Sequence, residues 1–412
     1  MTLAKPLFYL VAGEPSGDAI GASLIRALRE LRPGARFAGI GGERMASEGI
    51  NSLVPIRELA IMGILEVLPR ARRILRRVRE TVADIRRLQP DVVITIDSSG
   101  FCFRVTERLR KDARHPLLVH YVAPMVWAWR EHRARKTAEA TDHLLTLLPF
   151  EPRYFEEVGL DTTYVGHPVV EGLAASGDGP GFRARYAIAP EAPVLSLLPG
   201  SRRAEVRRLL PIFRETVLQL SAKWPDLVCV VPTVDTVAGE VVEGLKDWPV
   251  RVVLIRGVEE KFDSFAAADV ALAASGTVTL ELAMARLPTI VAYKVWAPTA
   301  WMLKRTLKVP YATLINILLD RLAIPEFLQE NCTAEKLASA VDGLFSDPAK
   351  RAAQIEDGQQ ALKRIGLGGE WPSHRAARKI LSLLEAALPD GLHEVGGNLD
   401  QVAVGISAVD RA

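Results

Sequence analysis

The sequence has few cysteines and no long apolar run, and each shortage excludes a class of protein. Its three cysteines, Cys102, Cys229 and Cys332, are odd in number and far apart, which argues against a disulfide framework and suits a reducing cytosol. No CxxC, HExxH or close His/Cys cluster occurs, so we expect no structural metal. No segment approaches the roughly 18 apolar residues of a membrane-spanning helix, and the N-terminal apolar run is interpreted as a buried strand rather than a signal peptide. These absences predict a soluble or peripheral protein.

The sequence also lacks the common nucleotide signatures. Neither GxxxxGK[ST] nor GxGxxG occurs, which counts against an ATPase and against an ordinary dinucleotide oxidoreductase. There is no Asp-x-Asp pair either, so a metal-bridged diphosphate has no obvious ligand. We therefore expect any bound diphosphate to be neutralised by arginine side chains and helix dipoles.

Apolar runs typical of strands alternate with helical patterns along all 412 residues. The runs are Leu7–Val11, Arg36–Ile40, Val92–Asp97, Leu117–Val122 and His143–Leu148 in the first half, and Val194–Leu198, Leu227–Val231, Val250–Ile255, Val270–Ala273 and Thr289–Tyr293 in the second. Several are almost continuously apolar, as in strands that are covered on both faces. The pattern predicts an α/β protein with two doubly wound, Rossmann-like parallel sheets around a cleft, an arrangement that suits a two-substrate reaction.

Composition sets the expected boundaries. Residues 1–170 form the first lobe, 171–190 a linker rich in small residues, and 191–370 the second lobe. A helix at about 373–388 is a candidate to pack back on the first lobe. The polar tail, 390–412, is a candidate for disorder.

The turn after the first strand, Ala12–Asp18, is the most informative short segment. The strand ends at its glycines and a helix begins directly after them, which exposes the backbone N–H groups of the first helical turn to a ligand. Glu14 and Ser16 add a carboxylate and a hydroxyl at the carboxyl end of the strand. The alternative is a plain β–α turn in which Asp18 caps the helix. We interpret the turn, including Gly17, as part of a site.

Asp97 ends another buried strand. A carboxylate in that position is well placed as a general base, particularly where loss of water raises its pKa. The alternative is an aspartate that only caps a helix or shapes a turn.

The second lobe has two candidate phosphate sites. Gly200, Ser201 and Arg202, followed by Arg203, join a strand to a helix, with Ser201 as the expected N-cap. The alternative is a solvated basic first turn, which the helix dipole disfavours, so we expect an anion to compensate these arginines.

The other candidate begins at Ser275 and also joins a strand to a helix. Ser275, Gly276 and Thr277 offer hydroxyls and backbone N–H groups. Glu281 follows Thr277 by one helical turn, where it can accept hydrogen bonds from a ribose. The segment therefore favours a nucleotide site.

A basic amphipathic helix is predicted between Arg70 and Arg87, which includes eight arginines against two acidic residues. The apolar stretch Leu59–Leu68 lies just upstream. The alternatives are a core helix with a solvated arginine face, an anionic membrane surface, and a nucleic acid. The helix has no aromatic residue on which bases could stack, so membrane contact is favoured over nucleic acid.

Taken together, several segments resemble the lipid-A-disaccharide synthase family, in the order in which that family has them between residue 7 and about 332. They are Ala12–Asp18, Gly39-Ile-Gly-Gly-Glu43, Met62-Gly63 with Glu66-Val67-Leu68, Val126-Trp-Ala-Trp-Arg130, Leu148-Pro-Phe-Glu151, Gly166-His-Pro168, Leu198–Arg202 and Ser275–Glu281. The resemblance implies an inverting glycosyltransferase of two lobes, the GT-B architecture. It would move 2,3-diacylglucosamine from UDP-2,3-diacylglucosamine to the 6-hydroxyl of 2,3-diacylglucosamine 1-phosphate, with UDP and a β-1,6 disaccharide as products.

The family pattern also implies roles for individual residues. Asp97 would be the base, with Glu14, Ser16, Gly17 and Asp18 on the acceptor side. UDP would be held by Gly200, Ser201, Arg202, Ser275, Gly276, Thr277, Glu281 and Asn316. Acyl chains and phosphates would meet the membrane-facing residues Ile61, Met62, Ile64, Leu65, Leu68, Arg72, Arg73 and Arg76.

The resemblance further implies a cytoplasmic enzyme, peripheral on the anionic inner membrane of a Gram-negative cell, and a possible homodimer. No cofactor, metal or nucleic-acid partner is expected, since the UDP-sugar is itself a substrate.

Two departures from the family pattern bear on these expectations. The family usually has Asp-x-Pro-Asp-Phe where this chain has Asp97-Ser-Ser-Gly-Phe101, so a second acid is replaced by Gly100. It also tends to have Leu-Pro-Asn where this chain has Leu314-Ile-Asn316, which keeps the asparagine. The first departure motivates an alternative, a non-catalytic paralogue that binds UDP-sugar or lipid. A UDP-sugar 2-epimerase on the same scaffold is another, but it leaves the apolar stretch and the arginine helix unexplained.

Overall fold

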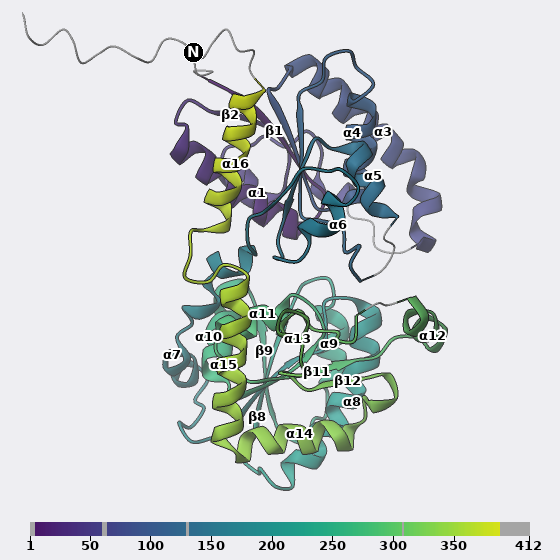
Figure 1. The fold of residues 1–412 in the computed structure, drawn as a ribbon. Coiled ribbons are helices and arrows are strands. Elements are labelled where there is room, and N and C mark those ends of the chain that lie inside the picture. The colour runs from purple at the N-terminus through teal and green to yellow at the C-terminus, as the bar shows by residue number, and fades with distance from the viewer. Residues whose placement is uncertain (1–4, 60–63, 129–131, 307–308, 388–412) are drawn as a thin grey trace, which may run out of the picture.

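The computed structural model describes residues 5–59, 64–128, 132–306 and 309–387, and it shows two α/β lobes, one above the other in Figure 1. Each lobe has a six-stranded sheet flanked by helices, and every strand pair is parallel. The α/β class predicted from the alternating apolar runs is therefore confirmed.

The sheet of the first lobe has the strand order β2-β1-β3-β4-β5-β6. Its elements are β1 (Leu7–Ala12), α1 (Pro15–Leu31), β2 (Arg36–Ile40), α2 (Glu43–Ser47), η1 (Ile56–Glu58), α3 (Ile64–Leu88), β3 (Val92–Ile96), α4 (Ser99–Leu109), β4 (Leu117–Tyr121), α5 (Arg133–Ala140), β5 (His143–Thr146), α6 (Pro152–Glu156), β6 (Thr162–Tyr164) and η2 (Pro168–Glu171). The three-residue edge strand β6 is only partly buried and has no apolar run, so the sequence pattern did not predict it.

The sheet of the second lobe has the order β12-β11-β10-β7-β8-β9. Its elements are η3 (Leu173–Ala175), α7 (Gly179–Arg185), β7 (Val194–Leu198), α8 (Arg203–Ser221), β8 (Val228–Thr233), α9 (Ala238–Gly244), β9 (Arg251–Arg256), α10 (Val258–Ala267), β10 (Val270–Ala274), α11 (Val278–Met284), β11 (Thr289–Tyr293), α12 (Ala297–Thr306), α13 (Leu314–Leu319), β12 (Glu326–Leu328), η4 (Gln329–Asn331), α14 (Ala334–Ser346) and α15 (Pro348–Arg364). The segment 171–190 thus contains η3 and α7, and α7 packs against α10.

Strand alternation builds a separate core on each face of the first sheet. In β1, Phe8 and Leu10 face the core that includes α1, whereas Tyr9 and Val11 face the core beneath α3 and α4. All four side chains are fully buried, which explains why β1 is continuously apolar in sequence.

The last described helix, α16 (Pro372–Ala386), returns from the second lobe to the first and packs beside α1 (Figure 1). Ile380 and Leu384 join the α1 core, and Arg32 forms an ion pair with Glu385 at 2.7 Å. The tail 390–412 lies outside the described residues.

The strand order reverses beside the first strand of each sheet. In the first lobe the chain leaves β1 for β2 on one side and later returns to β3 on the other. In the second lobe β7 lies between β8 and β10 in the same way. Because successive crossovers cover opposite faces, the turns at the carboxyl ends of these central strands diverge and leave a crevice. The turns that begin at Gly13, Asp97, Gly200 and Ser275 all lie at these two places.

We expect Ile380→Ala to lower the free energy of unfolding by about 2–5 kcal/mol, because it leaves a cavity in the α1 core. Ser382→Ala is the matched control: it lies on the exposed side of the same helix and should change stability by no more than about 0.5 kcal/mol. Urea denaturation followed by circular dichroism measures both. Equal midpoints for the two variants would show that α16 adds nothing to the core of the first lobe.

Candidate active site

Each lobe has a cavity at its strand-order reversal. The cavity of the first lobe has a volume of about 520 Å³, and its lining includes Glu14, Asp97, Gly100, Arg104, Arg133 and the apolar residues Leu59, Ile74, Leu75 and Phe101. The cavity of the second lobe has a volume of about 600 Å³, and its lining includes Gly200, Ser201, Arg202, Glu205, Lys261, Ser275, Gly276, Thr277 and Glu281. Nine of the thirteen residues predicted to be catalytic or to bind substrate therefore line one of the two cavities.

Asp97 sits in a sharp turn at the end of β3. Asp97 and Ser98 both adopt left-handed backbone conformations, with φ of 53° and 41°. The Ser98 amide donates a hydrogen bond to Asp97 Oδ1 at 2.7 Å, and the Ser16 hydroxyl donates to Oδ2 at 3.4 Å. Two consecutive non-glycine residues in this region cost free energy, and such strain concentrates at functional sites. The turn presents the Asp97 carboxylate to the cavity.

Gly13 lets the first turn approach the Asp97 turn. A Cβ on Gly13 would lie 2.4 Å from Ser98 Oγ and 2.5 Å from Ser98 Cβ, which is closer than real side chains come. The absence of a side chain thus places Glu14 beside Asp97. Burial raises the pKa of Glu14, the negative charge of Asp97 raises it further, and Arg202 of the second lobe opposes the shift. The two carboxyl groups therefore form an interacting pair.

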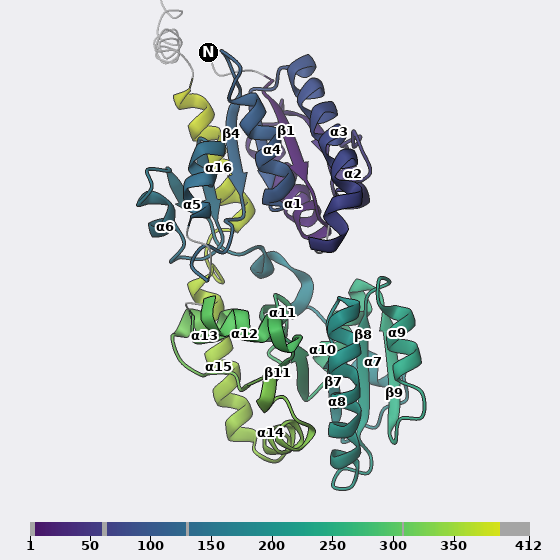
Figure 2. The ribbon, with the colours of Figure 1, turned by 90° about the vertical axis from the view of Figure 1, so that its right-hand side faces the viewer.

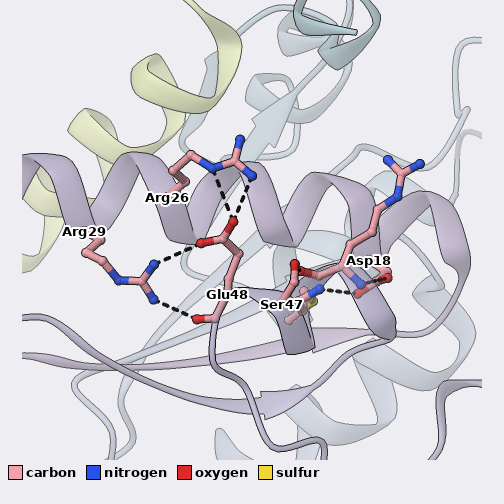
Figure 3. Close-up of polar contacts among 7 residues, drawn as sticks. Asp18, Arg26, Arg29, Ser47 and Glu48 are labelled. Carbon is pink, nitrogen blue, oxygen red and sulfur yellow. Dashed lines mark hydrogen bonds and ion pairs between the residues drawn. The ribbon is translucent and has the colours of Figure 1, made fainter. Parts of the chain in front are cut away.

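Asp18 has a structural position. It is 5% exposed, and its carboxylate accepts hydrogen bonds from the backbone amides of Gly42, Arg44 and Met45 at 2.7, 3.1 and 3.0 Å. Figure 3 shows this contact beside a second one, in which Glu48 binds Arg26 and Arg29 of α1. Both contacts hold the short helix α2 against α1, so Asp18 acts on α2 rather than in the cavity.

Gly17 is also placed for packing. A Cβ on Gly17 would lie 3.3 Å from the Ile96 carbonyl oxygen, so the glycine allows α1 to cross close to β3. Of the four residues expected on the acceptor side, Glu14 and Ser16 interact with Asp97, whereas Gly17 packs against β3 and Asp18 binds α2.

Helix α3 supplies one apolar wall of the first cavity through Ile74 and Leu75. Its other apolar residues, Val78, Val82 and Ile85, are buried against the sheet, as the helical spacing predicted. Arg72, Arg73 and Arg76 are exposed, whereas Arg77 is held by Glu58 and Glu80 at 2.7 and 2.6 Å. Ile61 and Met62, and the side chains of Ile64, Leu65 and Leu68, lie outside the described residues. Within the described ranges, no helix combines the length and the apolar character that crossing a membrane requires.

In the second lobe, α8 begins at Arg203 with Arg202, not Ser201, as its N-cap. Gly200 has φ of +111°, and Glu205 Oε2 accepts hydrogen bonds from the amides of Ser201 and Arg202 at 3.2 and 3.3 Å.

The anion expected beside the two arginines is present within the protein. Glu205 binds the Arg202 side chain at 3.0 Å, and Glu240 binds Arg203 at 3.1 Å. A bound phosphate is therefore not required to offset the helix dipole. Arg202 still lines the cavity with its side chain 62% exposed, whereas Arg203 is not part of the lining.

The opposite wall of this cavity is the turn Ser275–Thr277 with Glu281 of α11. Glu281 forms an ion pair with Lys261 Nζ at 2.9 and 3.1 Å. Sequence reasoning missed Lys261, because it lies in α10 with no motif around it and meets Glu281 only through packing. The Ser275 hydroxyl donates to the Ala312 carbonyl oxygen at 2.9 Å and so holds the loop before α13 against the cavity.

Asn316 is fully buried outside the cavity lining. Its amide nitrogen donates to the Ile324 carbonyl oxygen and to Glu326 Oε1 at 2.8 and 2.7 Å. Its amide oxygen accepts from the amides of Ala323 and Ile324 at 2.9 and 2.8 Å. Every hydrogen-bonding position of this side chain is thus occupied by the protein. The structure places Asn316 as a support for the loop between α13 and β12.

Glu151 is a second buried carboxyl that sequence reasoning did not single out as a site residue. It accepts hydrogen bonds from Trp127 Nε1 and from the amides of Leu147 and Leu148, at 3.1, 3.0 and 2.9 Å. Burial raises the pKa of Glu151 to about 7. Trp127 and Leu148 pack in the same apolar cluster as Leu198 of the second lobe. Glu151 therefore orders a segment through which the two lobes touch.

Comparison with known proteins gives one consistent family. The family model described as lipid-A-disaccharide synthetase matches residues 8–380. A lipid-A-disaccharide synthase of Rhodospirillum centenum is 50% identical over 92% of this chain and 95% of its own length. One of Paramagnetospirillum magneticum is also 50% identical, over 92% of this chain and 97% of its own length.

Solved structures share the fold at low identity. The S. aureus MnaA-UDP co-structure has a TM-score of 0.65 at 12% identity, covering 92% of this chain and 97% of that one. MurG of Acinetobacter baumannii has a TM-score of 0.54 at 13% identity, covering 93% and 99%. These neighbours show the fold of this chain and nothing finer.

We expect Gly13→Ala to reduce stability by about 1–3 kcal/mol and to displace Glu14 from Asp97, because the new methyl group overlaps Ser98. The double variant Gly13→Ala/Ser98→Gly should recover most of the loss, since it removes the overlapping atoms and glycine suits the φ of 41° at that position. Thermal unfolding and UDP release measure the two effects. A double variant no better than the single one would exclude this close approach as the cause.

Proposed function

Since the chain belongs to the lipid-A-disaccharide synthase family, it is a hexosyltransferase, and we propose that its two cavities hold the two lipid substrates of that reaction. The reaction moves 2,3-diacylglucosamine from UDP-2,3-diacylglucosamine to the 6-hydroxyl of 2,3-diacylglucosamine 1-phosphate, and it yields lipid A disaccharide and UDP. The observation that carries the assignment of the cavities is the difference between their linings. Glu14, Asp97 and an apolar wall from α3 line the first, together with Arg104 and Arg133. Two strand–turn–helix junctions, Gly200–Arg202 and Ser275–Thr277, line the second, with the cations Arg202 and Lys261 and the acidic residues Glu205, Asp235 and Glu281.

The second cavity suits the UDP part of the donor. Arg202 can bind phosphate oxygens through its planar guanidinium group, and Lys261 adds a second cation at the opposite wall. Ser275, Gly276 and Thr277 offer polar groups between them, with Glu281 placed to accept hydrogen bonds from the ribose. This proposal needs no separate cofactor, because the protein's own cations face the diphosphate. The UDP-bound structure of S. aureus MnaA supports UDP-sugar binding by this fold.

The first cavity suits the acceptor and the proton transfer. Asp97 accepts the proton of the acceptor 6-hydroxyl as its oxygen attacks the anomeric carbon of the donor sugar. The bond from that carbon to the UDP oxygen breaks on the opposite face, so the configuration inverts. Arg202 and Lys261 stabilise the charge that develops on the leaving UDP.

Gly100 stands where the family usually has a second acid. We propose that Glu14 supplies the second carboxyl group beside Asp97 instead. Burial raises the pKa of Glu14, and the negative charge of Asp97 raises it further. We propose Asp97 as the base and Glu14 as the carboxyl group beside it. Space for a side chain remains at Gly100, where the nearest atom to an added Cβ is Arg104 Nη1 at 3.8 Å.

The outer side of the first cavity suits the acyl chains and the membrane. Leu59, Ile74 and Leu75 form an apolar wall, and Arg72 and Arg73 are exposed on the helix that carries Ile74. We propose that α3 rests on the anionic inner membrane from the cytoplasmic side, with its arginines at lipid phosphates. Homodimer formation stays a prediction.

We expect Arg202→Ala to weaken UDP binding about tenfold or more, since a hydrogen bond to a charged group contributes about 1.5–3 kcal/mol. Arg203→Ala is the matched control, because Arg203 is the next residue, has a similarly exposed side chain and binds Glu240 outside the cavity. Isothermal titration calorimetry with UDP compares them. Equal losses would point to general charge rather than to a phosphate contact at Arg202.

The enzyme should release UDP from UDP-2,3-diacylglucosamine only when 2,3-diacylglucosamine 1-phosphate is present. Asp97→Asn should reduce kcat by about 10²–10⁴-fold, because the base is removed, while UDP binding is kept. Asp112→Asn, on the surface and paired with Arg86, should leave kcat unchanged.

Each outcome separates one part of the proposal. An absence of acceptor-dependent release at high enzyme concentration would favour a non-catalytic binding protein. Full activity of Asp97→Asn would remove Asp97 as the base and leave the glycosyltransferase assignment standing.

A further inference from the structure

The second lobe carries an exposed aromatic surface on and just before α12. Trp296, Trp301 and Met302 are 64%, 61% and 45% exposed, which is unusual for large apolar side chains on one short segment. The guanidinium of Arg305 lies 3.8 Å from the centre of the Trp301 ring, one helical turn away. We call Trp296, Trp301, Met302 and Arg305 the α12 surface.

The segment of sequence that carries the α12 surface has charged residues of one sign. In the sequence, residues 294–319 include Lys294, Lys304, Arg305 and Lys308 and no acidic residue. Tryptophan beside lysine and arginine is typical of helices that lie in a membrane interface, where the rings enter the headgroup layer and the cations meet phosphates. This charge is complementary to an anionic lipid surface.

The position of α12 agrees with that occupant. In Figure 1, α12 lies away from the sheet at the right-hand edge of the molecule, and α3 lies at the same edge. Figure 2 is viewed from that side and shows α3 in the first lobe and α12 in the second. Helix α12 also follows β11, at the carboxyl edge of the sheet where the second cavity opens. A lipid surface against α3 would therefore be on the side of the molecule that α12 faces.

We propose that the α12 surface is a second membrane contact, made by the donor-binding lobe on an anionic bilayer. This inference rests in part on the proposed contact through α3. Both substrates carry acyl chains, so a lobe that touches the bilayer itself can take its lipid-linked donor from the layer that supplies the acceptor. Trp296 and Trp301 enter the interface, and Arg305 binds lipid phosphate.

The test is the binding of the full chain to phosphatidylcholine vesicles with and without phosphatidylglycerol, measured by flotation. Trp296→Ser/Trp301→Ser should bind anionic vesicles about tenfold more weakly than the unchanged protein, because two interfacial anchors are lost. Trp371→Ser is the matched control, since this tryptophan is 54% exposed next to α16, in the other lobe. It should bind as the unchanged protein does. Quenching of tryptophan fluorescence by brominated lipid should fall in the double variant and not in the control.

The α3 variant Arg72→Glu/Arg73→Glu/Arg76→Glu separates the two proposals. A loss of binding in the α3 variant with none in the α12 variant would overturn this inference and leave the α3 contact standing. If the unchanged protein showed transferase activity but did not bind anionic vesicles, both proposed membrane contacts would be overturned and the transferase assignment would stand. A change of the α12 variant from dimer to monomer without vesicles would show that the surface binds a second copy instead. Lost activity on detergent-dispersed substrates with unchanged vesicle binding would also contradict the inference.

Discussion

The reversal of strand order beside β1 and β7 is the constraint on which the rest of the structure depends. Because crossovers on the two sides of each central strand cover opposite faces of the sheet, the turns that follow these strands leave a crevice. Polar and charged side chains gather there, at the carboxyl ends of strands whose own residues are buried. Two sheets with the same reversal provide two crevices, as a reaction between two substrates requires.

The two crevices differ in the residues that line them. Glu14 and Asp97 are brought together in the first lobe by the close approach at Gly13, and the negative charge of Asp97 adds to the burial that raises the pKa of Glu14. Arg202 lines the second crevice, and its positive charge partly opposes the rise in the pKa of Glu14 in the first. Acid–base chemistry in one lobe and charge stabilisation in the other agree with the transfer of a sugar away from a diphosphate.

Much of the fold could be predicted, because a parallel strand that is covered on both faces must be apolar along its whole length. Eight interior strands follow from such runs, and the edge strands β2 and β9, although partly exposed, keep enough apolar residues over five and six positions to be predicted as well. The edge strands β6 and β12 have only three partly buried residues each and leave no such pattern. The site turns could be predicted as well, since strand–turn–helix junctions with glycine and polar residues are visible in sequence. Lys261 could not, because it meets Glu281 only when α10 and α11 are placed side by side.

The sequence by itself determined the fold class, the family and the turns at which a site can form, because these depend on local apolar periodicity and on short ordered motifs. Only the tertiary structure decided what each polar side chain does. Asp18 and Asn316 belong to matching motifs, yet Asp18 accepts three hydrogen bonds from α2 and its N-terminus, and all four hydrogen-bonding positions of Asn316 hold the loop before β12. Glu205 and Glu240 likewise supply the anions expected from a ligand. The physical reason is that a side chain's partners come from segments far away in the sequence, and only folding brings those segments into contact.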